Sequence, residues 1–319
     1  MTDLSAELYG GMKLRRKLPD IAFDDQTAEN PAHETHSFPG YLGFPMESLD
    51  LGHWLTYHDS TVDRVALSFG SIKVTWYGIA VVCGFVVGLW TASRRAIKDR
   101  ITPEAVADLG LWLMIGGIAG ARLWYVVEYW KDEFAGRSLW ETVAVYRGGL
   151  VFYGGLAGAT LATILYSRKR GLPLWKLADA LAPSIALGHF FGRIGCFING
   201  CCYGTHCTLP WAVHYNDVPY DNPGQALHPV QLYEAALNIA LYSLLARQYQ
   251  RKRFDGETFA FYLLGYGIVR FTVEFFRGDY AVHYLGGWAT PGQIASFVLF
   301  AAGLIIWVNR KQLAGRKPQ

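Results

Sequence analysis

Seven apolar stretches, each about 20 residues long and almost free of charged side chains, constrain this chain more than any other feature. They are residues 74–93, 105–129, 148–167, 178–199, 230–247, 258–276 and 291–309. A helix needs about 20 mostly apolar residues to cross a hydrocarbon core about 30 Å thick. Seven helices that are apolar on every face would leave a soluble domain little polar surface. The sequence therefore predicts an all-α fold, a polytopic membrane helical bundle with seven transmembrane helices.

The composition supports a membrane protein over a soluble one. Only 17% of the residues are charged and 52% are hydrophobic, whereas soluble domains carry about 25% charged residues. The net charge is only +3, and no heptad or collagen-like repeat occurs. Coiled coils, collagens and basic nucleic-acid binders are thereby excluded, and no nucleic-acid partner is expected.

The Lys and Arg content of the loops predicts the orientation. Loops 94–104, 168–177 and 247–257 and the tail 309–319 together carry 16 of these residues, whereas the alternate loops carry 4. Because basic residues are retained on the cytoplasmic side, this alternation places the N-terminus outside and the C-terminus in the cytoplasm. It also supports seven as the number of spans, since a missed span would break it.

Three parts of the chain differ in character. Residues 1–65 are polar and are expected to form a disordered extension, residues 66–310 form the seven-helix transmembrane domain, and residues 311–319 form a basic cytoplasmic tail. The extension lacks the apolar core of about 7–15 residues that a secretory signal peptide needs. One interpretation is that translation begins at Met46, so whether residues 1–45 are made stays open.

Three arginines lie inside predicted spans, namely Arg122, Arg193 and Arg270. A charged side chain at membrane depth is unfavourable by a few kcal/mol, so it faces the protein interior or a wet cavity and has a partner. Glu274, one helical turn beyond Arg270, is such a partner. A purely structural role is the alternative for each arginine, and it is strongest for Arg122.

Polar residues recur at the outer ends of several predicted helices, where one shared site could be built. The stretches are Trp76-Tyr77-Gly78, residues 147–156, residues 192–204 (Gly-Arg-Ile-Gly-Cys-Phe-Ile-Asn-Gly-Cys-Cys-Tyr-Gly), residues 228–234 and residues 265–277. Arginine suits an anionic phosphate there, because its planar fork stays charged and donates two hydrogen bonds.

These stretches, in this order, resemble the prolipoprotein diacylglyceryl transferase family. The family signature Gly-Arg-x-Gly-Asn-Phe-x-Asn-x-Glu-x-x-Gly is matched at six positions: Gly192, Arg193, Gly195, Phe197, Asn199 and Gly204. The resemblance implies a multi-pass enzyme of the cell inner (plasma) membrane that needs no cofactor. It would move the diacylglyceryl group of phosphatidylglycerol onto the lipobox cysteine of a prolipoprotein, releasing glycerol 1-phosphate.

The chemistry of the headgroup suggests a role for each polar residue. We expect Arg193 to clamp the phosphate, Arg270 to stabilise the leaving group and Glu274 to orient Arg270. The expected lipid-binding residues are Tyr77, Gly154, Asn199, Gly204 and Tyr266. His228, Gln231 and Glu234 are expected to cap and hold the fifth helix, with lining of the entrance as the alternative.

The third catalytic candidate is Tyr153, which stands where family members often carry a histidine before Gly-Gly. A phenol with a pKa near about 10 is a poor base at neutral pH. We therefore expect Tyr153 to orient the headgroup, while nearby arginines favour the thiolate of the substrate. The identity of the thiol-activating base stays open.

The cysteines also depart from the signature, because Cys196 and Cys201 replace its Asn and Glu. With Cys202 and Cys207 they place four thiols within 12 residues. The spacing lacks the Cys-x2–4-Cys pairs of zinc sites, so no metal is expected. A disulfide among Cys201, Cys202 and Cys207, or free packing cysteines, remains open.

Glycines at four-residue spacings, Gly116, Gly117, Gly120, Gly154 and Gly158, predict close helix packing rather than a phosphate loop. Two other functions stay possible: a non-catalytic phospholipid-binding or transport protein that kept the headgroup site, and a related enzyme with another acceptor. A transporter predicts inverted repeats, and the two halves show no such similarity.

Overall fold

The chain is described by a computed structural model that covers residues 64–69, 72–136, 138–145, 148–215, 225–278 and 289–316. In chain order the elements are β1 (Val65–Phe69), β2 (Ile72–Thr75), α2 (Trp76–Ala96), the 3-10 turn η1 (Ile97–Asp99), α3 (Pro103–Glu128), the π-type turn η2 (Trp130–Phe134), α4 (Trp140–Val143), α5 (Phe152–Lys169), α6 (Leu174–Asn199), β3 (Val213–His214), β4 (Ala226–Leu227), α7 (Val230–Gln250), α8 (Glu257–Glu274) and α9 (Pro291–Gly315). Residues 1–63 of the expected N-terminal extension lie outside the described residues.

Each of the seven predicted stretches overlaps one long helix along most of its length: α2, α3, α5, α6, α7, α8 or α9. Four of them, namely α2 extended through η1, α3, α6 and α9, are long and apolar enough to cross a membrane. Threonines begin three of the long helices. The hydroxyls of Thr75, Thr102 and Thr290 accept hydrogen bonds from Gly78, Ala105 and Gln293 respectively, which satisfies backbone donors that a helix start leaves unpaired.

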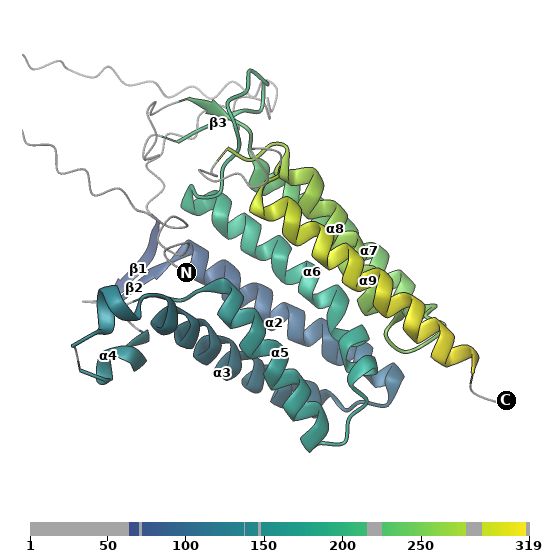
Figure 1. Cartoon of the computed structure of the whole chain (residues 1–319). Coiled ribbons are helices and arrows are strands. Elements are labelled where there is room, and N and C mark those ends of the chain that lie inside the picture. Colours follow the sequence, from purple (N-terminus) through teal and green to yellow (C-terminus); the bar gives the residue numbers. More distant parts are fainter. Residues whose placement is uncertain are drawn as a thin grey trace, which may run out of the picture. The chain divides into compact units, whose positions relative to one another are not determined.

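Helix α6 lies in the middle of the bundle (Figure 1) and packs against α2 on one side and α7 and α8 on the other. Helix α3 pairs with α5, and α9 pairs with α8. One core cluster joins Ala182 and Ala186 of α6 to Leu241 of α7 and Val273 of α8. The polar residues predicted on α6, α7 and α8 are thereby brought to one region.

Large apolar side chains cover the outside of the bundle. Val127 is 70% exposed, and Val82, Phe297 and Leu123 are similarly open. A soluble monomer rarely exposes apolar patches of this extent, whereas hydrocarbon chains accommodate them. The exposed apolar helix faces and the four helices of spanning length agree with an all-α membrane protein.

Glycines hold α3 and α5 together, as their spacing predicts. A Cβ on Gly120 would overlap the carbonyl oxygen of Gly154, and one on Gly158 would overlap that of Gly116. The two backbones therefore touch directly, an arrangement that only residues without a side chain permit. Gly154, expected to bind substrate, lies in this helix contact.

Two short antiparallel hairpins interrupt the helical plan and were not predicted. β1 pairs with β2 directly before α2, and β3 pairs with β4 in the segment between α6 and α7. The second hairpin has a small core of Tyr203, Val213, Tyr215 and Leu227. Strands of two to five residues are too short for a period of two to stand out in the sequence.

A fourth buried arginine corrects the sequence analysis, which placed Arg95 in a basic loop. Helix α2 continues to Ala96, and the Arg95 side chain is buried against α6. Its guanidinium donates hydrogen bonds to the Ala180 carbonyl and to the hydroxyls of Thr91 and Ser184. Arg95 therefore joins α2 to α6.

Candidate functional site

Two arginines from different helices meet at one buried carboxylate. Glu234 of α7 is 1% exposed, and its Oε2 lies 3.0 Å from Nε of Arg193 on α6. The same oxygen lies 3.6 Å from Nη1 of Arg270 on α8. Glu234 was expected to cap and hold the fifth helix, but its side chain instead bridges the two arginines. The Coulomb attraction between these charges is larger in low-dielectric surroundings than at a surface, but the desolvation of the buried charges offsets it.

Glu274 holds the other side of Arg270, as its position one helical turn away predicted. Oε2 of Glu274 lies 2.8 Å from Nη2 of Arg270, and the Thr290 hydroxyl donates a 2.6 Å hydrogen bond to Oε1. Gly292 leaves room for this carboxylate, since a Cβ there would overlap it. The N-terminus of α9, which carries a partial positive charge, therefore faces Glu274 and stabilises its negative charge.

The charges of this cluster balance, and one guanidinium keeps nitrogens for a ligand. Two arginines and two glutamates sum to zero, so an arriving anion would meet fixed donors rather than an uncompensated charge. Arg193 is 19% exposed and pairs with Glu234 through Nε. Among the described residues, no ion pair involves its two Nη nitrogens. These nitrogens can form the fork that binds a phosphate through two hydrogen bonds.

A group of three aromatic rings lies in the region of the arginines. The Tyr266 ring lies 4.6 Å from the His189 imidazole, centroid to centroid, and stacks on Tyr262 at 5.8 Å. His189 precedes Arg193 by one turn of α6, and its Nδ1 is buried with no hydrogen-bond partner in the part of the chain that is described. Sequence analysis missed His189; its i, i+4 spacing from Arg193 was the available signal.

Tyr77 approaches the site from α2, where a glycine of α6 admits it. A Cβ on Gly195 would lie 3.1 Å from the Tyr77 ring, so this signature glycine sets the close approach of α2 and α6. The Tyr77 phenol interacts electrostatically with Arg193 and with the thiols of Cys196, Cys201 and Cys202. The structure thus brings Tyr77 together with residues of α6.

The loop after α6 is held by α7. The Gln231 amide donates a 2.7 Å hydrogen bond to the Cys201 carbonyl and a weaker one, at 3.4 Å, to the Tyr215 hydroxyl. Burial raises the pKa of the Tyr215 phenol above its ordinary value, so this hydroxyl stays protonated. The backbones of Gly204 and His228 are also hydrogen-bonded. Gln231 and His228 therefore anchor the loop to the start of α7, but no side chain caps this helix, so the capping part of the prediction is wrong.

Two of the signature positions flank this loop. Asn199 is the last residue of α6, and its side chain interacts with the Cys201 thiol. Gly204 packs where a Cβ would meet Val230, His228 and the Phe276 carbonyl oxygen. Asn199 thus lies close to the thiols that follow α6. At Gly204, close packing explains why a glycine occupies the position.

Tyr153 lies apart from the arginine cluster. It is 56% exposed in the first turn of α5, and its ring contacts the edge of Phe152. In the described parts of the chain no hydrogen bond or ion pair joins it to Arg193, Arg270 or their glutamates. The polar interactions of the described residues therefore combine α2, α6, α7, α8 and the start of α9, and Tyr153 of α5 adds no hydrogen bond or ion pair to them.

Arg122 is hydrogen-bonded to backbone carbonyl groups away from the arginine–glutamate cluster. Its guanidinium donates hydrogen bonds to the carbonyl oxygens of Glu141, Thr142, Gly148 and Gly149, at 2.6–3.1 Å. Two of these carbonyls belong to α4 and two to the segment that leads from α4 to α5. The alternative of a structural role for Arg122 is therefore the one that its geometry favours.

Three of the four neighbouring cysteines converge. The Sγ atoms of Cys196, Cys201 and Cys202 all lie within 4.8 Å of one another, and each residue is half-buried. Cys207 is buried and does not belong to this group. All five cysteines are free thiols in the structure, so the thiol that completes the group is Cys196 of α6 rather than Cys207.

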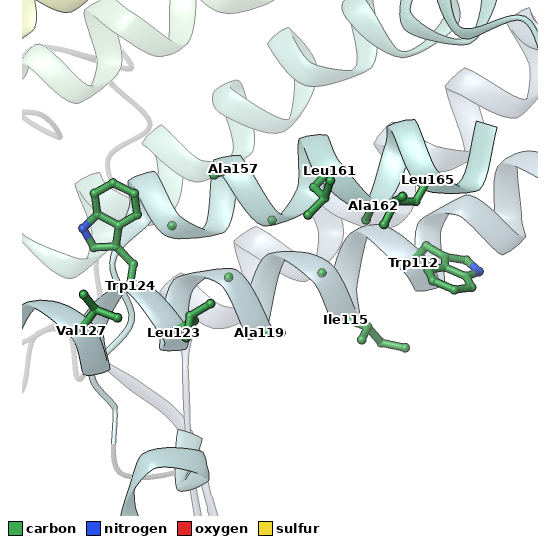
Figure 2. Close-up of a pocket in the computed structure, with 14 residues that line it drawn as sticks. Trp112, Ile115, Ala119, Leu123, Trp124, Val127, Ala157, Leu161, Ala162 and Leu165 are labelled. Atoms are coloured by element: carbon green, nitrogen blue, oxygen red, sulfur yellow. The ribbon is translucent and has the colours of Figure 1, made fainter. Parts of the chain in front are cut away.

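An apolar groove lies elsewhere among the described residues. It has a volume of about 630 Å³ and runs between α3 and α5, with Trp112 at one end and Trp124 at the other (Figure 2). Its lining is almost wholly apolar and contains no residue of α6, α7 or α8. It is therefore an apolar face of the α3–α5 pair and separate from the arginine cluster.

The apolar helices and the buried arginine–glutamate cluster define a helical membrane protein with a polar site inside its bundle. The chain belongs to the prolipoprotein diacylglyceryl transferase family, whose model matches residues 64–309. Among its relatives are proteins named phosphatidylglycerol--prolipoprotein diacylglyceryl transferase. The one from Allorhizobium ampelinum is 38% identical over 274 residues, which are 81% of this chain and 93% of the relative. The one from Nitratidesulfovibrio vulgaris is 38% identical over 255 residues, 78% of this chain and 94% of the relative.

Proposed function

We propose that this protein transfers the diacylglyceryl group of phosphatidylglycerol to the lipobox cysteine thiol of a prolipoprotein. The main structural support for this proposal is that Arg193 and Arg270, from separate helices, meet at the buried carboxylate of Glu234. The relatives that are named for this reaction match this chain over nearly their whole length. Family membership supplies the substrates, and the arginine cluster supplies a site for their anionic part.

The reaction creates charge where the arginines lie. The thiol loses its proton to a base, its sulfur forms a bond to the glyceryl carbon, and the bond from that carbon to the phosphate oxygen breaks. The phosphodiester carries one negative charge, whereas the released glycerol 1-phosphate gains a second. Donors that are already oriented stabilise such developing charge without reorganisation. Arg193 would clamp the phosphate and Arg270 would stabilise the leaving oxygen, held by Glu234 and Glu274.

The surrounding residues would position the lipid. Tyr77, Asn199 and Tyr266 would bind its polar parts, while Gly154 and Gly204 keep the backbone close. Tyr153 would orient the headgroup from the start of α5, where its exposed ring leaves it accessible.

We further propose that all seven long helices cross the inner membrane, with the C-terminus in the cytoplasm. One polar cluster supports this topology. Lys252 follows α7 and lies 2.6 Å from Asp99 after α2 and 3.1 Å from Asp179 near the start of α6. Arg310, near the end of α9, donates to the Asp255 carbonyl. Alternating spans place these helix ends on one side, which is also the side with most Lys and Arg.

A direct assay tests the function. The purified protein is incubated with phosphatidylglycerol vesicles and a lipobox peptide, and mass spectrometry reads the peptide. The expected product is a diacylglyceryl adduct on the cysteine, and the peptide with serine at that position should stay unmodified. If no adduct forms although phosphatidylglycerol binds, the enzyme function is refuted and a lipid-binding protein is favoured.

A further inference from the structure

The turn after α6 is built to bring three thiols together. Gly200, which caps the end of α6, has a φ of 69°, and Cys202 also has a positive φ, of 59°. The left-handed region is unfavourable for a residue that carries a Cβ. Here it folds the chain back, so that Cys201 and Cys202 face Cys196 in the last turn of α6. Both backbone polar groups of Cys201 are hydrogen-bonded: its N–H donates to the Cys196 carbonyl, and its carbonyl accepts from the Gln231 amide.

The spacing of the sulfur atoms fits a metal ion. Zinc binds thiolates at about 2.3 Å, so three sulfurs around one zinc lie about 3.8 Å apart. The three Sγ atoms already lie within 4.8 Å of one another, so small side-chain rotations would bring them to the spacing that zinc requires. Packing cysteines are commonly fully buried, as Cys207 is, whereas these three are half-buried and accessible to a ligand.

The charges beside the thiols favour zinc over a monovalent cation. Three thiolates and Zn²⁺ leave one negative charge, whereas three thiolates and a monovalent copper ion leave two. The Arg193 and Arg277 side chains interact electrostatically with Cys202, and Arg193 lies one helical turn before Cys196 on the same face of α6. Both arginines can stabilise this residual negative charge, which rises to two when the acceptor thiolate takes the fourth position.

We propose that Cys196, Cys201 and Cys202 bind one zinc ion, whose open fourth position takes the acceptor thiol of the prolipoprotein. The second part rests on the proposed function. Three protein ligands with one open position are the arrangement of catalytic rather than structural zinc sites. The metal would supply the thiol activation that the exposed Tyr153 is poorly suited to give.

The chemistry balances without any oxidant or reductant. The acceptor thiol loses its proton to water when its sulfur binds zinc. That sulfur then forms the C–S bond to the glyceryl carbon, and the electron pair of the broken C–O bond leaves with glycerol 1-phosphate. The thioether product is a neutral, weaker ligand than the thiolate, so the modified peptide leaves the ion.

Metal content provides the first test. The full chain, purified without chelator, is analysed by elemental mass spectrometry beside Cys196→Ser, Cys201→Ser, Cys202→Ser and the control Cys83→Ala, which alters an exposed thiol on α2. We expect about one zinc ion per wild-type and control chain and about tenfold less in each serine variant. Zinc-free wild-type protein with two of the three cysteines in a disulfide would overturn the proposal.

Cobalt substitution tests the open position on the wild-type chain, independently of how the variants fold. Co²⁺ in a thiolate site gives a sulfur-to-cobalt charge-transfer band. We expect this band to strengthen when the lipobox peptide is added and to stay unchanged with the serine peptide. An unchanged band with both peptides would overturn the role of the fourth position.

The two proposals fail differently. If metal-free protein still forms the lipid adduct at the full rate, the zinc site is refuted as an activator while the transferase function stands. If zinc binds and the cobalt band responds to the thiol peptide, but no adduct forms with phosphatidylglycerol, the zinc site stands and the proposed function is refuted.

Discussion

The Nε atom of Arg193 lies 3.0 Å from Oε2 of Glu234, and this carboxylate joins α6 to α7 inside the bundle. The same oxygen also faces Arg270 of α8. A single side chain thereby sets the separation of two guanidinium groups that come from different helices. Glu234 is consequently the residue whose removal should disturb both arginines at once.

Replacing Glu234 by glutamine should therefore reduce transfer strongly. Glu234→Gln keeps the size of the side chain but removes the charge that holds both arginines. We expect kcat/KM to fall by about 10²–10³-fold, the effect of losing one oriented electrostatic group at an active site. Glu104→Gln, at an exposed position in the first turn of α3, is the control and should be unchanged. A Glu234→Gln enzyme of wild-type activity would contradict the bridging role.

Lysine substitution should separate charge from geometry at the arginines. Arg193→Lys keeps the positive charge but loses the planar fork that contacts Glu234 through Nε and offers two further nitrogens. We expect kcat/KM for phosphatidylglycerol to fall by about 10²-fold. Arg170→Lys, in the exposed ion pair with Asp108, should leave the rate unaffected. Equal rates for the two variants would mean that only the charge of Arg193 matters.

Tyr153 should contribute little to the chemical step. Because its ring is exposed and lies apart from the arginine cluster, Tyr153→Phe should retain activity within about threefold, a loss typical of one neutral hydrogen bond. The measurement is kcat in the adduct assay, with Arg193→Ala as the reference for a severe loss. If Tyr153→Phe lost as much activity as Arg193→Ala, an orienting role would be untenable.

Arg122 should matter for stability instead. Arg122→Leu would remove four hydrogen bonds to carbonyl oxygens of α4 and of the segment between α4 and α5. We expect a loss of about 1–3 kcal/mol in the free energy of unfolding, because four partly buried carbonyls lose their donor. A thermal melt in detergent measures it, together with the KM of the folded fraction. A large rise in KM without a lower melting temperature would indicate contact with substrate.

Glycine spacing offers a matched pair on α3. A Cβ on Gly120 would overlap the Gly154 backbone, whereas one on Gly117 would meet its nearest atoms only at 3.9 Å. Gly120→Ala should therefore destabilise the α3–α5 pair by about 1–3 kcal/mol, as overpacking does, while Gly117→Ala should be neutral. Melting temperatures of the two variants give the comparison. Similar values would show that the helices can separate without penalty.

Much of the helical plan could be read from the sequence, because a helix is a local structure. Long apolar runs predicted the positions of α2, α3, α5, α6, α7, α8 and α9, and the four-residue spacing of Gly116, Gly120, Gly154 and Gly158 predicted a contact that the structure contains. The Arg270–Glu274 pair was equally visible, since residues four apart lie on one helix face.

Contacts between helices could be decided only by the tertiary structure, since they depend on which faces meet. The packing of α6 against α7 makes Glu234 the partner of Arg193, although nothing local links the two residues. The turn at Gly200 selects Cys196 rather than Cys207 to complete the thiol group. Burial of Arg95 between α2 and α6 likewise required the full extent of α2. The sequence by itself thus determined the helices and the charges inside them, and packing decided which of those charges face one another.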